Sequence, residues 1–136
     1  MALILIKGGL AAVGGLLGWF LGGADTFLHA LIVFVTVDYI TGIMRGIVEK
    51  NLCSAIGARG IFKKMLIFLL VGVANIVDVY LINSGNVLKS AVIFFYASNE
   101  GISILENTTA IGLPVPQKLR DVLQHLKNSN DGGEPK

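Results

Sequence analysis

The chain has 136 residues, of which 54% are hydrophobic and 15% are charged, with a formal net charge of +2. An ordinary soluble domain is about 45–50% apolar with glycine included, and about 25% charged. A small soluble domain cannot bury that much apolar surface, so the composition indicates that lipid is the solvent. It argues against an ordinary soluble enzyme and against disorder, and the small net charge gives no support for nucleic-acid binding.

Four apolar stretches follow one another, each close to the roughly 20 residues that a membrane-spanning helix needs. They cover residues 2–23, 26–44, 65–82 and 87–111. Turn-forming residues at 22–25 and 83–86 separate the first two and the last two. We therefore expect an all-α integral membrane protein with three to four transmembrane helices, formed by residues 1–113. The first stretch is expected to be retained, since Lys7 follows apolar residues instead of leading them as in a signal peptide.

The basic residues predict the orientation in the membrane. They are Lys7, Lys89, a group between the second and third stretches (Arg45, Lys50, Arg59, Lys63, Lys64), and a group in the tail (Lys118, Arg120, Lys127, Lys136). With four crossings and a cytoplasmic N-terminus, ten of these eleven residues are cytoplasmic, in agreement with the positive-inside rule. Three crossings preserve this orientation but leave the first stretch outside or flat on the membrane. Lys63 and Lys64 are predicted to anchor the third stretch at the inner headgroups.

Acidic residues interrupt three of the apolar stretches. Placing a charge at membrane depth costs at least ~2.5–3.5 kcal/mol, so such residues need a partner or water. Helical spacing extends them into polar stripes: Asp38, Gly42 and Arg45; Asn75 and Asp78; and Tyr96, Glu100, Ser103 and Asn107. Asp38 and Glu100 lie at similar distances from the basic end and could share a level. The stripes either face a water-filled lumen formed by several copies or pair within one bundle.

Glycines in the first stretch form a possible helix-packing face. Gly14, Gly18 and Gly22 are spaced by four residues and so lie near one another on a helix. Glycine permits close approach of two backbones, which favours association of membrane helices. The partner could be a second copy or a helix of the same chain, although glycine is also simply common in membrane helices.

The residues after the last apolar stretch are polar. Within residues 114–127, apolar positions recur at helical spacing: Val115, Leu119, Val122, Leu123 and Leu126. This predicts a short amphipathic helix on the inner membrane surface, with a partner-binding helix or a solvated helix as alternatives. Residues 128–136 are expected to be disordered.

Neither a catalytic site nor a metal site is predicted. Cys53 is the only cysteine, and His29 and His125 have no neighbours at the spacing of metal ligands. The sequence holds no nucleophile elbow, phosphate loop or zinc-protease motif. We therefore expect a protein that is not an enzyme and that uses no cofactor.

Several motifs together resemble a known family. They are Asp38 to Ile43 (DYITGI), Ser54 to Lys64 (SAIGARGIFKK), Ala74 to Asp78 (ANIVD), Phe95 to Asn107 (FYASNEGISILEN) and Ile111 to Pro116 (IGLPVP). Over about Val37 to Leu126, the chain resembles the bacteriophage holins of the group that includes clostridial toxin-secretion holins. Its Asp38, Asp78, Asn99 and Glu100 match polar motif positions of that family. Members are often drawn with three crossings, and the first stretch here lies outside the match.

The resemblance implies a function that composition could not show. Holins accumulate in the cytoplasmic membrane and then assemble into lesions that let a cell-wall hydrolase (an endolysin) escape, while relatives release large toxins. This implies membrane lipid and further copies of the chain as partners, and a multi-pass protein with a cytoplasmic C-terminus. Two other classes remain: a small ion-coupled transporter and a structural membrane subunit. Compact four-helix exporters carry an acid in their first helix, and the first stretch here has none.

Overall fold

The computed structural model describes residues 1–23, 25–83 and 85–130. Its elements are α1 (Ala2–Leu21), α2 (Thr26–Val48), α3 (Ser54–Ile76), a π-helical continuation η1 (Val77–Ile82), α4 (Val87–Ile111) and α5 (Gln117–Asn130). Within these ranges there is no strand, which confirms the all-α prediction. Among the described residues, three helical segments are long and apolar enough to cross a membrane: Ala2–Leu21, Thr26–Val48 and Ser54–Ile82.

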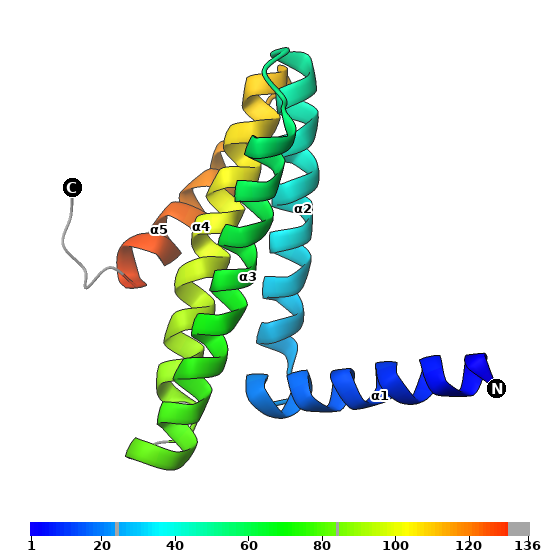
Figure 1. The fold of residues 1–136 in the computed structure, drawn as a ribbon. Helices are drawn as coiled ribbons and strands as arrows, with labels where there is room; N and C mark the ends of the chain where they lie inside the picture. Colours follow the sequence, from blue (N-terminus) through cyan, green and yellow to red (C-terminus); the bar gives the residue numbers. More distant parts are fainter. Residues whose placement is uncertain (24, 84, 131–136) are drawn as a thin grey trace.

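Helices α2, α3 and α4 form a long bundle in which sequential helices run antiparallel (Figure 1). The buried apolar core of the bundle comprises Leu28, Leu31 and Val35 of α2, Ile67 and Val71 of α3, and Ile93 of α4. Steps of three and four residues keep such side chains on one face of each helix, as in a coiled coil. Most other large apolar side chains of these helices are exposed, as expected for a protein whose outer surface contacts lipid.

The start of α3 differs from the prediction. The helix begins at Ser54, well before the predicted start at residue 65, so most of the supposed polar connection is helical. Tertiary packing explains the extension: the Tyr39 hydroxyl donates to the carbonyl oxygen of Gly57 at 3.3 Å, and the Tyr39 ring lies against Gly60. Because glycine has no side chain, α2 and α3 approach closely at this end of the bundle.

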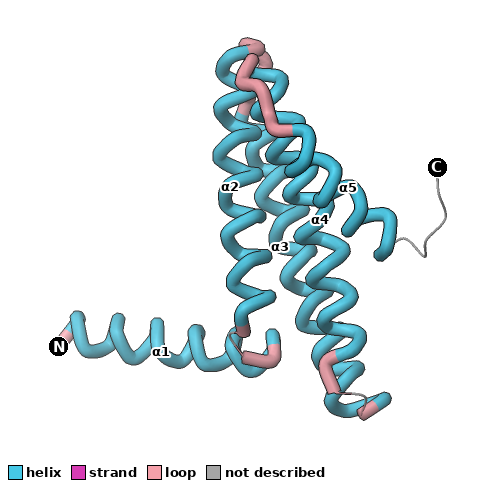
Figure 2. Tube along the Cα trace, turned by 180° about the vertical axis from the view of Figure 1, so that it is seen from behind, coloured by secondary structure: helices cyan, strands magenta, loops and turns pink. Residues whose placement is uncertain are grey.

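Helix α1 points away from the bundle at a steep angle, and only its C-terminal end lies beside the other helices (Figures 1 and 2). None of its residues is buried. At its C-terminal end, the Phe20 ring packs closely on Gly72 of α3, and the Asn75 side-chain amide donates to the Phe20 carbonyl oxygen at 3.1 Å. Gly22 ends the helix in the left-handed conformation with φ of 82°, which glycine adopts without strain. Helix α1 thus does not lie alongside the other three helices.

Helix α5 folds back along α4 (Figure 1). Leu123 is buried, and its side chain lies against Gly101 of α4. The Arg120 guanidinium donates to the Thr109 hydroxyl at 3.2 Å. The helix ends at Asn130, three residues beyond the predicted limit of 127, and the rest of the predicted tail, 131–136, lies outside the described residues.

Candidate functional site

Three helices bring three charged side chains together inside the bundle. The Lys64 ammonium donates to Asp38 Oδ2 at 2.7 Å and to Glu100 Oε1 at 3.2 Å. The side chains of Lys64, Asp38 and Glu100 are only 16%, 11% and 8% exposed. Asp38 and Glu100 therefore share a level, as predicted. Contrary to the anchoring role predicted for it, Lys64 turns into the bundle and joins the two acids; we call these three residues the triad.

An amide continues the triad toward the basic end of the bundle. Asn107 of α4 donates to Asp38 Oδ1 at 3.2 Å and to the Thr41 hydroxyl at 3.1 Å. Arg45 donates to Asn107 Oδ1 at 3.4 Å and also forms an ion pair with Glu49 at 3.0 Å. The predicted polar stripes of α2 and α4 thus face one another and pair within a single chain.

Two cavities flank the triad. A cavity of about 220 Å³ borders Asp38 and Lys64 on the side of Tyr39 and Ser103. Another of about 520 Å³ lies between α3 and α4, where Asn99 contributes to the lining together with Lys63 and Glu100. Ser103 borders both. The predicted residues Asn99 and Ser103 therefore lie beside the triad and line these cavities.

A second buried polar cluster closes the opposite end of the bundle. Asp78 of η1 accepts hydrogen bonds from the backbone N–H groups of Leu88 at 3.1 Å and Lys89 at 2.7 Å. These are among the free N–H groups of the first turn of α4, where a carboxylate is favourable. The Lys89 ammonium, almost fully buried, donates to the Gly22 carbonyl oxygen at 3.4 Å and to Asp25 at 3.3 Å. We call Asp25, Asn75, Asp78 and Lys89 the turn cluster.

Asp25 connects this cluster to the start of α2. Its carboxylate accepts from the Leu28 N–H at 2.7 Å and so caps the helix. Burial raises the pKa of Asp25, but the Leu28 hydrogen bond and the Lys89 ammonium outweigh it and hold that pKa below its usual range. The ionised form of Asp25 is therefore stabilised in the folded chain.

Of the three glycines in the predicted packing face, only Gly22 contacts another helix of the same chain. A side chain added at Gly14 or Gly18 would meet nothing within 4 Å, whereas one at Gly22 would collide with Asn75. Within the subunit, α1 and α3 therefore approach closely at Gly22 and at Gly72 of α3, which lies against the Phe20 ring. Gly14 and Gly18 remain open for another molecule.

Lys64 and Lys89 are the functional-site candidates that sequence reasoning missed. A signal for each was present. The inward-facing residues of α3 and η1 are Gly57, Gly60, Lys64, Ile67, Val71, Ala74 and Asp78, which alternate steps of three and four. On α4, Lys89 and Ile93 continue the stripe of Tyr96, Glu100, Ser103 and Asn107 by the same steps.

The arrangement is suited to holding helices together. In the described part of the chain, every buried side-chain nitrogen and oxygen has a hydrogen-bond partner, and no group of three His, Cys, Asp or Glu residues could hold a metal ion. The charged side chains of the triad join α2, α3 and α4. Those of the turn cluster link the ends of α1 and η1 with the starts of α2 and α4. Removing one member of such a pair leaves a buried charge without compensation.

The fold and these clusters define a helical membrane protein whose bundle is closed by buried ion pairs. Residues 15–128 match the model of the bacteriophage holin family, and the chain belongs to that family. It is 38% identical over 112 residues to a protein described as a probable holin from Bacillus phage phi105, covering 82% of each chain.

Bacterial relatives without an assigned function are also similar. An uncharacterized 14.9 kDa protein in the nagH 3' region of Clostridium perfringens is 45% identical over 123 residues, covering 90% of this chain and 93% of its own. The uncharacterized protein YqxH of Bacillus subtilis is 35% identical over 112 residues, covering 82% and 79% respectively. No solved structure matches this chain.

Proposed function

We propose that this chain assembles in the bacterial cytoplasmic membrane into lesions through which an endolysin, or a large toxin, leaves the cell. The family match over residues 15–128 is the observation that carries the proposal, supported by the similarity to the probable holin of phage phi105. The protein acts in this proposal through its assembly and performs no catalysis.

The closed bundle supports a requirement for several copies. The cavities beside the triad, of about 220 and 520 Å³, are no larger than small-molecule pockets. A folded hydrolase is far larger than either. Release of such a protein therefore requires an opening between subunits, which favours a homo-oligomer as the active form.

The polar residues supply the groups that such an opening would need. While the chain is dispersed in lipid, Asp38 and Glu100 are neutralised in part by Lys64, and the apolar outer surface contacts acyl chains. If the helices separate during assembly, the same side chains can face water. We assign this lumen-facing role to Asp38, Arg45, Asn75, Asp78, Asn99, Glu100 and Ser103.

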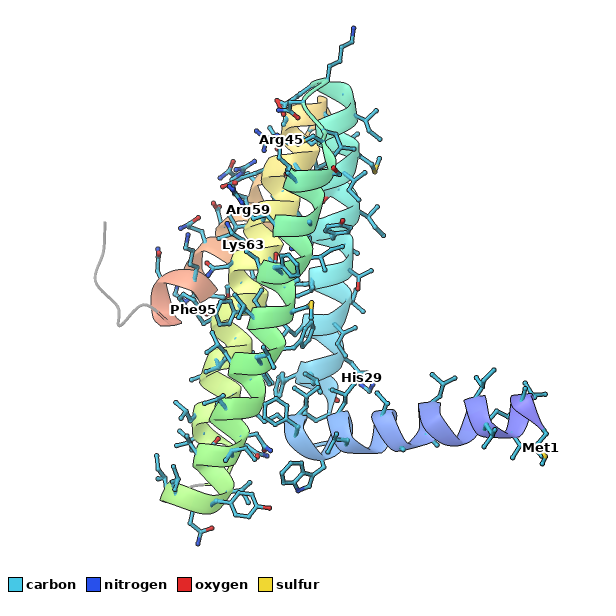
Figure 3. The ribbon with its side chains drawn as sticks, in the orientation of Figure 1. Met1, His29, Arg45, Arg59, Lys63 and Phe95 are labelled. Atoms are coloured by element: carbon cyan, nitrogen blue, oxygen red, sulfur yellow. The ribbon has the colours of Figure 1, made fainter. Side chains whose placement is uncertain are left out.

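The charge distribution favours a cytoplasmic C-terminus. Arg59 and Lys63 of α3 lie at the same height along the bundle as α5, which carries Lys118, Arg120 and Lys127 (Figure 3). Basic residues are retained on the cytoplasmic side of bacterial membrane proteins. The turn cluster then lies toward the external face, and α1 leaves the bundle on that side.

Expression in a bacterium tests the function. Cells carrying the inducible gene are followed for entry of an impermeant dye and for release of a co-expressed cytosolic enzyme, while the amount of protein in the membrane is measured. We expect sudden dye entry followed by enzyme release. Export of particular small solutes from cells that exclude the dye would support an ion-coupled transporter instead, and neither effect would support a structural subunit.

A further inference from the structure

Helix α5 presents an apolar strip that contacts within the chain leave uncovered. Leu123 is buried against the bundle, whereas Leu119, Val122 and Leu126 are 47%, 51% and 38% exposed. These three residues are spaced by three and four, so they lie on one side of the helix. A partner outside the chain is needed to cover them.

Basic residues border this strip. Around the helix, Lys118 lies next to Val122 on one side of the strip, and Lys127 and Arg120 lie on the other side, beyond the buried Leu123. The opposite side of the helix carries Gln117, Asp121, Gln124 and Asn128. Long basic side chains at the edge of an apolar strip can lay their stems along acyl chains and place their charges among phosphates. This distribution is complementary to an anionic lipid surface.

The position of α5 along the bundle agrees with such a surface. Leu123 contacts Gly101, and the adjacent Glu100 pairs with Lys64. The apolar part of α3 and η1 begins directly after Lys64, and from Met65 to Ile82 it is about 27 Å long, close to the ~30 Å hydrocarbon core of a bilayer. Two independent features, the end of an apolar segment and the docking site of an amphipathic helix, thus fall at one level.

We propose that α5 lies on the inner leaflet and binds anionic phospholipid headgroups. Leu119, Val122 and Leu126 enter the acyl region, while Lys118 and Lys127 contact lipid phosphates. Because lipid binding by α5 is measured without leakage, this inference can fail independently of the proposed function.

Fluorescence of the full-length chain tests the proposal. In a Cys53→Ser background, a single cysteine replaces either Val122 on the strip or Gln124 on the polar side and carries an environment-sensitive label. The labelled proteins are reconstituted in vesicles of phosphatidylcholine alone or with phosphatidylglycerol. We expect emission from position 122 to shift to the blue when phosphatidylglycerol is present, and emission from position 124 to remain typical of water.

A charge variant supplies the control. Lys118→Gln with Lys127→Gln should abolish the phosphatidylglycerol-dependent shift at position 122, while Arg120 keeps its contact with Thr109 and holds α5 on the bundle. Equal exposure to water at positions 122 and 124 would overturn the proposal. A blue shift at position 122 that does not depend on lipid charge but increases with the protein-to-lipid ratio would also overturn the proposal. A second copy of the chain would then cover the strip.

Discussion

Removal of the Lys64 ammonium is the most informative change to the closed bundle. Lys64→Met keeps most of the aliphatic side chain, so packing along the stem is largely preserved. It leaves Asp38 and Glu100, both mostly buried, without the cation that each contacts. Breaking a buried ion pair by removing one partner costs about 3–5 kcal/mol. We therefore expect the free energy of unfolding of the subunit to fall by about 3–5 kcal/mol.

The chain offers a matched control in the adjacent residue. Lys63 is exposed, so Lys63→Met should change the free energy of unfolding by no more than about 0.5 kcal/mol. The combination Asp38→Asn, Lys64→Met and Glu100→Gln removes the ammonium and both carboxyl groups and should recover most of the stability lost in Lys64→Met, because no uncompensated charge remains.

Unfolding in mixed micelles of dodecylmaltoside and sodium dodecyl sulfate, followed by circular dichroism, measures these differences. The free energy of unfolding is compared for the parent, the two single variants and the triple variant. The reasoning is refuted if Lys64→Met unfolds with the same small change as Lys63→Met. It is also refuted if neutralising all three residues is as harmful as removing Lys64 alone.

Three further predictions concern orientation, assembly and pH. Cys53 is exposed between α2 and α3, and an impermeant thiol reagent should label it only after intact cells are permeabilised; labelling before that would reverse the orientation. Gly18→Leu should lower the yield of crosslinked oligomers in membranes, while Gly9→Leu on the opposite side of α1 should not. The same yield for both variants would show that the face with Gly14 and Gly18 is not the interface between subunits. Because its pKa is lowered in the fold, Asp25 should stabilise the chain above its ordinary pKa of 3.8 and lose that contribution as pH falls through the lower folded value. Thermal unfolding of Asp25→Asn and the parent should therefore differ at pH 6 and converge at strongly acidic pH.

The sequence predicts the helices of the bundle well because lipid leaves a chain few alternatives. Every backbone polar group must be satisfied within the membrane, so long apolar stretches become helices. A prediction from apolar content alone misplaces the start of α3, because the first turns of this helix are polar. They are held in place by packing of Gly57 and Gly60 against Tyr39 of α2. The inward-facing residues around Lys64, which recur at alternating steps of three and four, predict the extent of α3 better than mean hydropathy does. These steps follow the buried face of the helix whether the residues on it are apolar or charged.

The direction of α1 could not be predicted in the same way. Its composition suits a membrane span, and its length is sufficient. Its angle depends on contacts between residues far apart in the chain, namely Phe20 with Gly72 and Asn75, and on the backbone of Gly22. The shared level of Asp38 and Glu100 could be predicted from the rise of the helices, but the Lys64 ammonium between them depends on how a third helix packs.

The timing of leakage in Glu100→Gln tests the central claim, that the charges closing the subunit also control its opening. The triad holds two carboxyl groups and one ammonium, so the substitution leaves the pair of Asp38 and Lys64 in place and removes the second group that can carry a negative charge when water enters. Closed subunits should then be favoured over a water-filled opening. The measurement is time-resolved dye entry after induction, at matched membrane levels, with Glu106→Gln at an exposed position of α4 as control. We predict later onset and smaller extent of leakage for Glu100→Gln, with Glu106→Gln like the parent. The same onset and extent for Glu100→Gln and the parent would contradict the account and leave Glu100 a purely structural role.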